Sequence, residues 1–209
     1  GRSIIHMGIG EPDFDTPAFI RKAAADALEA GYTHYGPAAG LPEFRKLIAA
    51  TWRARRGIAC EAANVVVTPG AKPILFFAML ATLEPGDEVL IPSPAFPNYG
   101  SMAQFAGGRV VTTPLMPGRG FDLDLDALRA RINPRTRAIV LNSPNNPTGG
   151  VLSGATLHAV RELVLEHDIS VIADDIYADM VYEGGCTSFA SLPGMFERTV
   201  TVDGFSKTY

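Results

Sequence analysis

The chain has 209 residues, of which 47% are apolar and 19% are charged, and its formal net charge is −4. This composition is typical of a globular protein with a full core and excludes a disordered or fibrous chain. A negative charge without any basic run argues against nucleic acid as a main partner. The longest apolar stretch, residues 73–83, is too short for a membrane span and no charged leader precedes Gly1, so we expect a cytoplasmic protein.

Cysteine and histidine are few and widely spaced. Cys60 and Cys186 lie far apart in the sequence, which predicts two structural thiols in a reducing compartment rather than a disulfide framework. The four histidines form no H-x-x-x-H or H-E-x-x-H pattern. The sequence therefore predicts no metal site.

Turn-forming residues dominate positions 8–15 and lead into a first predicted helix. Thr16 is the expected N-cap and Pro17 the first helical residue, and Gly31 ends the apolar pattern. The spacing of the glycines at the start does not match a dinucleotide-binding loop. We therefore interpret this region as a loop followed by an amphipathic helix.

A second loop, residues 32–40, precedes a helix whose apolar face begins at Leu41 and which Gly57 ends. Its last turn is crowded with basic side chains. We interpret them as solvated charges that suit the negative end of the helix macrodipole, rather than as an anion site. They are Arg53, Arg55 and Arg56.

The rest of the chain alternates between short β-branched runs and helical patterns. The predicted strands are 64–68, 88–91, 109–113, 138–141, 170–173 and Thr199–Val202. The predicted helices are 72–83, 98–106, 125–132 and 155–167. Such alternation predicts an α/β fold with three layers, a mostly parallel sheet with helices on both faces.

In a parallel sheet, ligands bind outside the carboxyl ends of the strands. The residues that follow each predicted strand are therefore the candidates for a site, and they carry a glycine turn, an aromatic ring, an amide, a carboxylate, a phenol and an amine. These residues are Gly70, Ala71, Lys72, Phe96, Asn146, Asp174, Tyr177 and Lys207.

Each of these residues also has a simpler interpretation. Gly70 either presents backbone N–H groups to a phosphate or makes a plain strand-to-helix turn. Phe96 either stacks on a flat ring or fills the core. Asp174 directly follows a buried strand, where a carboxylate needs a cation or donors. Lys207 follows an apolar run beside small residues, which makes it a candidate imine former, although most lysines are simply solvated.

Together, these groups describe a pyridoxal 5'-phosphate site. The sequence resembles the class I and II aminotransferases of the aspartate aminotransferase fold, which are pyridoxal phosphate enzymes of fold type I. The resemblance covers the whole chain and rests on four ordered motifs, at residues 10–14, 143–149, 174–177 and 204–209. Four motifs in this order are far more specific than any one of them alone.

The resemblance implies a role for each matching residue. Lys207 is expected to hold the cofactor as a Schiff base and to act as the general base, and Asp174 to pair with the pyridinium nitrogen. Tyr177 and Asn146 are expected to bond the phenolic oxygen of the ring, with Asn146 also near the substrate carboxylate. Phe96 is expected to stack on the ring, where many members have tryptophan.

The resemblance also implies how the phosphate and the substrate are held. Gly70, Ala71 and Lys72 match the turn beside the phosphate, and Ser206 is expected to contact the phosphate. The backbone of Gly10 is expected near the substrate. Tyr35 matches a tyrosine that reaches the phosphate of a neighbouring subunit, which implies a homodimer with shared sites; a packed loop aromatic is the alternative.

The expected activity is that of an amino acid:2-oxo acid aminotransferase. A pyridoxal phosphate lyase of the same fold and a non-catalytic aminotransferase-like domain remain alternatives. Lys72 resembles a lysine of members that accept dicarboxylic amino acids, which favours aspartate or glutamate as donor; a lysine that serves only the phosphate or solvent is the alternative. Residues 1–18 are expected to belong to the small domain or hinge and residues 19–209 to the cofactor-binding large domain, with the small domain and the C-terminal part of the large domain incomplete.

Overall fold

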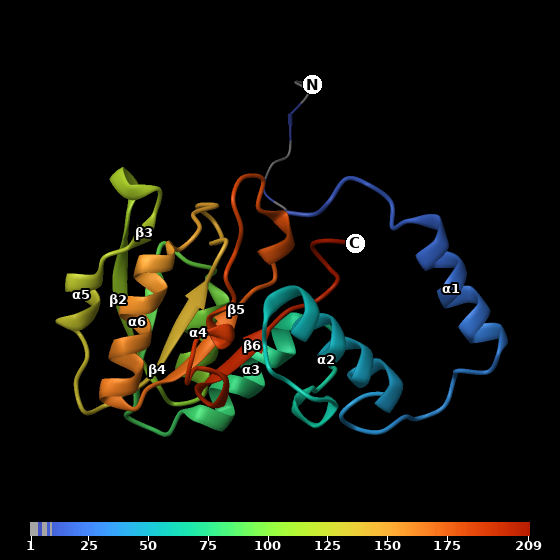
Figure 1. The fold of residues 1–209 in the computed structure, drawn as a ribbon, viewed down its shortest axis with the longest axis horizontal. Helices are drawn as coiled ribbons and strands as arrows, with labels where there is room; N and C mark the ends of the chain where they lie inside the picture. Colours follow the sequence, from blue (N-terminus) through green and yellow to red (C-terminus); the bar gives the residue numbers. More distant parts are fainter. Residues whose placement is uncertain (1–3, 6–7, 9) are drawn as a thin grey trace.

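The computed structural model describes residues 4–5, 8 and 10–209 of the chain. Within them, six strands form one sheet in the order β3-β2-β1-β4-β5-β6 (Figure 1). All neighbouring pairs are parallel except β2 and β3. The strands are β1 (Glu88–Ser93), β2 (Arg109–Met116), β3 (Asp122–Leu123), β4 (Thr136–Asn142), β5 (Ser170–Asp174) and β6 (Thr199–Val202).

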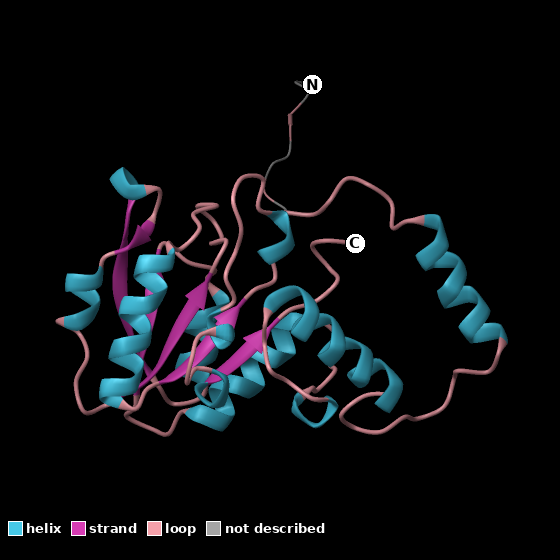
Figure 2. Ribbon diagram, in the orientation of Figure 1, coloured by secondary structure: helices cyan, strands magenta, loops and turns pink. Residues whose placement is uncertain are grey.

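Helices lie on both sides of this sheet (Figure 2). The α-helices are α1 (Ala18–Glu29), α2 (Pro42–Arg56), α3 (Ala71–Thr82), α4 (Asn98–Phe105), α5 (Leu125–Arg129) and α6 (Gly154–His167). Short 3-10 turns are η1 (Ala62–Asn64), η2 (Pro117–Arg119), η3 (Ala178–Met180), η4 (Phe189–Ser191) and η5 (Phe196–Arg198).

Successive side chains of the inner strands alternate between the two faces of the sheet. In β4, Ile139 and Leu141 pack with α5 and α6, whereas Ala138 and Val140 pack with α3 and α4. Because both faces are covered, these strands are apolar throughout rather than alternating with polar residues. The predicted three-layer α/β fold is confirmed.

The strand register gathers the predicted site residues at one edge of the sheet. Asn142 at the end of β4 is paired with Asp174 at the end of β5, and Asp174 with Val202 at the end of β6. Since parallel strands end on the same side, the loops that follow them share one edge. The loops that carry Asn146, Tyr177 and Lys207 all leave from there.

The strand predicted at 64–68 is wrong in this structure. Asn64 ends the 3-10 turn η1, and no partner strand for the following residues lies within the described part of the chain. Val65 has an extended backbone, as its β-branched side chain favours. Its carbonyl instead accepts from Arg45 Nε at 2.7 Å, and Val67 N donates to Ala39 O at 3.0 Å.

Three smaller differences concern element ends. The first helix begins at Ala18 with Pro17 rather than Thr16 in the N-cap position, because Pro17 has a non-helical ψ of 138°. Helix α5 stops at Arg129, three residues before the predicted end. The two-residue strand β3 was not predicted, since so short a segment has no periodicity. Gly57 ends α2 in the left-handed conformation, as predicted.

Helix α1 lies away from the sheet and contains no buried residue (Figure 1). Its apolar side chains Phe19 and Leu28 are 74% and 63% exposed. Within the described residues, no helix has both the length and the apolar character that crossing a membrane requires. Cys60 is buried and Cys186 partly buried, and both are free thiols.

Candidate active site

Asp174 lies at the centre of the candidate site. It ends β5, is only 4% exposed, and accepts hydrogen bonds from Tyr99 Oη at 2.6 Å and from the Ile176 backbone N–H at 3.2 Å. Burial raises the pKa of Asp174, and the two donors only partly oppose this shift. A buried carboxylate at a strand end with a raised pKa is typical of a site that binds a charged ligand.

An amide and a phenol lie together beside this carboxylate. Asn142 donates from Nδ2 to the Asp174 carbonyl at 3.0 Å, and its Oδ1 accepts from the Asn146 backbone N–H at 2.7 Å. Asn146 Nδ2 in turn donates to Tyr177 Oη at 3.4 Å. Burial and the nearby Asp174 raise the pKa of Tyr177, so its hydroxyl keeps its proton near neutral pH. Asn146 and Tyr177 are therefore placed side by side as donors.

The glycine turn at the start of α3 leaves its backbone open. Gly70 has a φ of 94° and a Cβ there would meet no atom within 4 Å. Its carbonyl accepts from Thr68 Oγ1 at 2.6 Å, which fixes the turn. The turn presents the N–H groups of the first turn of a helix, where a phosphate is favoured by both hydrogen bonding and the helix dipole.

The loop that carries the lysine packs against this turn. A Cβ on Gly204 would lie 3.8 Å from Ala71 Cβ, which is van der Waals contact, and 3.3 Å from Ile176 Cδ1, so this loop and the start of α3 lie close together. Lys207 Nζ donates to the Gly10 carbonyl at 2.7 Å. Lys207 and Gly10, which are 197 positions apart in the sequence, are thus brought together.

Phe96 joins the same region from the loop before α4. Its ring packs edge-on against Tyr99 with centroids 5.6 Å apart, and Lys72 Nζ lies 5.8 Å from its centroid. Phe96 is partly buried against the cluster formed by α3 and α4. The ring therefore fills part of the core and also contacts the tyrosine that donates to Asp174.

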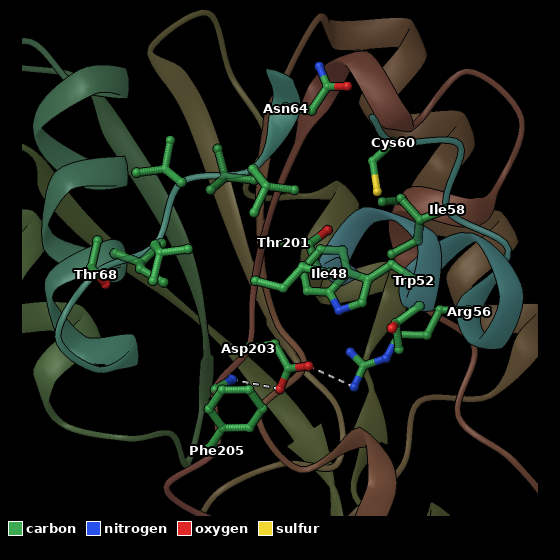
Figure 3. A pocket seen from close by; sticks show the side chains of 18 of the residues that line it. Ile48, Trp52, Arg56, Ile58, Cys60, Asn64, Thr68, Thr201, Asp203 and Phe205 are labelled. Atoms are coloured by element: carbon green, nitrogen blue, oxygen red, sulfur yellow. Dashed lines mark hydrogen bonds and ion pairs between the residues drawn. The ribbon is translucent and has the colours of Figure 1, made fainter. Parts of the chain in front are cut away.

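Two predicted residues are exposed and make no hydrogen bond with Asp174, Asn146 or Tyr177. Tyr35 is fully exposed, so its alternative interpretation as a packed loop aromatic is wrong within this chain. Ser206 is exposed and lines a cavity of about 730 Å³ between α2, β6 and the two segments 64–70 and 203–209 (Figure 3). Gly70 also lines this cavity, so Ser206 faces the glycine turn, whereas Asp174 does not line it.

The interpretation of the α2 arginines as solvated charges is wrong for Arg56. Its side chain is 12% exposed and lies 2.9 Å from Asp203 Oδ2. It is buried because α2 packs its last turn against the loops after β5 and β6, where carboxylates compensate its charge. Arg55 remains 57% exposed, and Arg53 donates to the Cys60 carbonyl at 2.7 Å.

Sequence reasoning missed Tyr99, Asn142 and Arg56 as parts of the site. Asn142 had a usable signal, since it directly follows the predicted strand 138–141. Tyr99 had only a helical position, which does not reveal that its hydroxyl reaches a strand 75 residues later. Arg56 had no signal in the sequence, because a basic residue in the last turn of a helix is usually solvated.

The residues present fit pyridoxal phosphate. A buried carboxylate suits a cationic ring nitrogen, the Asn146–Tyr177 pair suits a ring oxygen, and the open N–H groups at Gly70 suit a phosphate. Lys207 supplies an amine from the loop that packs on that turn. These groups come from segments scattered over the chain, and the folded sheet edge collects them.

Comparison with known proteins finds relatives that match this chain along nearly its whole length. The aspartate aminotransferase of Pyrococcus abyssi is 43% identical over 100% of this chain and 54% of its own length. The arginine–pyruvate transaminase of Pseudomonas aeruginosa is 42% identical over 100% of this chain and 53% of its own length. The crystal structure of an aromatic aminotransferase from Pyrococcus horikoshii matches with a TM-score of 0.95 and 44% identity, over 97% of this chain and 55% of that one.

The chain thus spans about half the length of the relatives it matches. The sequence model of the family described as aminotransferase class I and II matches residues 2–209. Because this match covers nearly the whole chain, the protein belongs to the aminotransferase class I and II family.

Proposed function

We propose that the protein is a pyridoxal phosphate-dependent aminotransferase that moves an amino group from an amino acid to a 2-oxo acid. The observation that carries this proposal is the buried Asp174, which lacks a cationic partner among the described residues and lies beside the Asn146–Tyr177 pair. A carboxylate in that position pairs well with a cationic ring nitrogen, and such a pair lowers the raised pKa of Asp174.

Pyridoxal phosphate, when bound, supplies an electron sink that stabilises negative charge at the substrate Cα. Lys207 would hold the group covalently and, once displaced by substrate, its Nζ would take the proton from Cα. Asp174 would stay ionised against the ring nitrogen, and Asn146 and Tyr177 would donate to the ring oxygen. The backbone at Gly70 and Ala71, with Ser206, would hold the phosphate.

The remaining predicted residues fit around these groups. Phe96 would stack on the ring while keeping its contact with Tyr99. The carbonyl of Gly10, which Lys207 contacts, would lie near the substrate. Tyr35, fully exposed here, would reach the phosphate of a second subunit in a homodimer. Residues 1–18 would belong to a small domain and 19–209 to the large domain.

Replacing Lys207 by alanine tests the function. The wild type is expected to show visible absorbance from covalently held pyridoxal phosphate, and Lys207→Ala to lose both this absorbance and transamination. Lys46→Ala, which removes an exposed lysine from α2, is the matched control. An unchanged cofactor spectrum with undiminished transamination in Lys207→Ala would disprove the proposal.

Lys72 is proposed to favour dicarboxylic donors, because it is exposed beside the Phe96 ring at the same sheet edge. The relatives described above are named as an aspartate aminotransferase, an arginine–pyruvate transaminase and an aromatic aminotransferase. Their names therefore leave the donor open. Lys72→Ala is expected to lower kcat/KM for aspartate about tenfold relative to alanine. An unaltered ratio between the two donors would contradict this preference.

A further inference from the structure

Arg56 ends α2 and points into a group of carboxylates behind the candidate site. Its Nη2 lies 2.9 Å from Asp203 Oδ2 and 3.9 Å from Asp179 Oδ1, and its Nη1 lies 3.6 Å from Asp175 Oδ2. Figure 3 shows the Arg56 and Asp203 side chains directed toward one another. The guanidinium carbon is 5.6 Å from the centre of the Trp52 ring, which stacks against it.

The carboxylates around Arg56 are joined to the residues of the site through the backbone. Asp175 directly follows Asp174, and its N–H donates to the Val202 carbonyl at 2.9 Å. Asp203 follows Val202 and begins the loop that carries Lys207. Arg56 therefore holds together the ends of β5 and β6, the two strands whose loops present Asp174, Tyr177 and Lys207.

The charged groups of Arg56 and its carboxylate partners are largely buried, so an uncompensated charge among them would be costly. The side chains of Arg56, Asp175 and Asp203 are 12%, 7% and 22% exposed. Burial raises the pKa of Asp203, and it raises that of Asp175 to about 7, while the charge of Arg56 lowers both. The other groups that face this cluster are Asp174, Asp179, Arg55, Cys186 and the Ser188 hydroxyl.

We infer that Arg56 is a positioning residue for pyridoxal phosphate, which fixes the Lys207 loop to the end of β5 by neutralising Asp203 and Asp175. This inference rests on the proposed function. Arg56 does not contact the groups that would touch the cofactor. It acts through Asp203 on Lys207 and through Asp175 on Asp174.

Removing the guanidinium leaves two close carboxylates without the cation that lies between them, and the exposed Arg55 side chain lies nearest to Asp179 instead. At high pH both are ionised and repel each other, which pushes the β5 and β6 loops apart. At low pH one of them takes a proton, because its pKa rises further without Arg56, and the repulsion disappears. A purely structural contact of Arg56 has no reason to depend on pH in this way.

The test is a titration with pyridoxal phosphate from about pH 6 to pH 8.5 in the protein expressed at its natural length, with absorbance as the readout. For Arg56→Gln, the Kd relative to wild type is expected to rise from about twofold at the low end to at least about tenfold at the high end. Arg56→Lys is expected to recover most of the affinity, since it keeps the charge. The melting temperature of the cofactor-free protein is a second readout and should fall most at high pH.

Arg53→Gln is the matched control, because it removes a guanidinium from the same helical turn without touching the carboxylates. Its Kd ratio is expected to stay near one at every pH. If Arg56→Gln gives no soluble protein, the double variant Arg56→Gln/Asp203→Asn decides, because it lacks the repelling pair of carboxylates. It is expected to be soluble and to have a Kd for pyridoxal phosphate whose ratio to that of wild type changes little with pH. A double variant that is also insoluble, or whose Kd ratio still rises steeply with pH, overturns the inference.

The outcomes also separate this inference from the proposed function. A wild type that binds no pyridoxal phosphate through Lys207 overturns the proposed function. A wild type that binds it normally, together with a ratio for Arg56→Gln that is constant or close to one, overturns only the role of Arg56.

Discussion

Glu88 begins β1 at the amino end of the sheet and Asp174 ends β5 at the carboxyl end, and both side chains are buried. Glu88 accepts from Arg109 Nη2 at 2.5 Å, Asn133 Nδ2 at 2.8 Å and Arg135 Nε at 2.9 Å. These donors lower the pKa of Glu88 to about 2. Among the residues that the structure describes, the Asp174 carboxylate accepts hydrogen bonds from Tyr99 and the Ile176 N–H alone, and its pKa is raised.

Under the proposed function, this contrast separates a structural carboxylate, Glu88, from one that binds a ligand, Asp174. Glu88 has a full set of cationic and amide partners, so its charge is stabilised by the folded chain alone. Asp174 has donors but no cation among the described residues, so its charge is left for a ligand to complete. A buried carboxylate at one end of the sheet thus has a lowered pKa, and a buried carboxylate at the other end has a raised one.

The largest expected effect comes from removing the charge of Asp174. Asp174→Asn keeps the size and the contact with Tyr99 but cannot hold a cationic ring nitrogen. We expect the rate at which an amino acid converts bound pyridoxal phosphate to fall by at least about 100-fold. Single-turnover absorbance measures it.

Asp126→Asn, an exposed carboxylate on α5, is the control and should leave the rate unchanged. A rate for Asp174→Asn within a few-fold of wild type would mean that Asp174, like Glu88, is structural. The contrast between the two edges would then be lost.

Asp175 is a second carboxyl with a raised pKa at the same end of the sheet as Asp174. Its pKa is about 7 instead of the ordinary 3.8. Because the pKa of Asp175 is raised by folding, this carboxyl contributes its full stabilisation of the folded state at pH values below 3.8. The contribution is lost as the pH rises from there through about 7. Wild type should therefore lose about 2–3 kcal/mol of unfolding free energy relative to Asp175→Asn as the pH rises from about 5 to about 8. Urea denaturation across this range measures the difference.

Asp126→Asn again serves as the control and should show no such slope. A difference between Asp175→Asn and wild type that stays constant with pH would show that this carboxyl is ionised throughout. Arg56 and Ser188 would then compensate its charge in full.

Glu88 is expected to show the opposite pH dependence at the other edge. Because its pKa is lowered, its contribution is present above the ordinary value of 4.5 and is lost as pH falls toward about 2. Glu88→Gln should lower the unfolding free energy by about 2 kcal/mol at neutral pH, and the difference should shrink in acid. Glu166→Gln, an exposed carboxylate on α6, is the control.

Denaturation of Glu88→Gln and wild type at several pH values provides the measurement. A loss that stays the same from neutral pH to acid would contradict the interpretation. The three donors would then act as packing rather than as partners of a charge.

Most of the fold and half of the site could be predicted from the sequence. Alternation of apolar strands and helices predicts a parallel sheet, and a parallel sheet brings the residues after each strand to one edge. That rule alone places Asp174, Asn146 and Tyr177 together. It works because it depends only on chain direction and order, which the sequence contains.

The remainder depends on tertiary contacts that have no local signal. The valines at 65–67 favour an extended backbone, but pairing needs a neighbouring strand, and none lies beside them in the described residues. Tyr99 and Arg56 become part of the site through side chains that cross between elements. A helical pattern shows which face of α2 is apolar but not which of its charges meets a carboxylate.

Replacing Tyr99 gives the smallest expected effect. It tests whether the hydrogen bond that Tyr99 donates helps to keep Asp174 ionised. Tyr99→Phe removes the hydroxyl that donates to Asp174 at 2.6 Å while keeping the ring against Phe96. We expect the cofactor-free protein to lose about 1 kcal/mol of unfolding free energy, and the pKa of Asp174 to rise further. Urea denaturation and the pH dependence of pyridoxal phosphate binding are the measurements.

Tyr182→Phe, in which the altered tyrosine is 96% exposed, is the control and should match wild type in both measurements. If Tyr99→Phe weakens pyridoxal phosphate binding mainly at low pH, the lost donor has made the Asp174 carboxylate easier to protonate, as its burial requires. Equal weakening at all pH values would instead mean that the hydroxyl only supports packing. In that case Asp174 would stay charged without help, and its edge of the sheet would resemble that of Glu88 more closely than its donor set indicates.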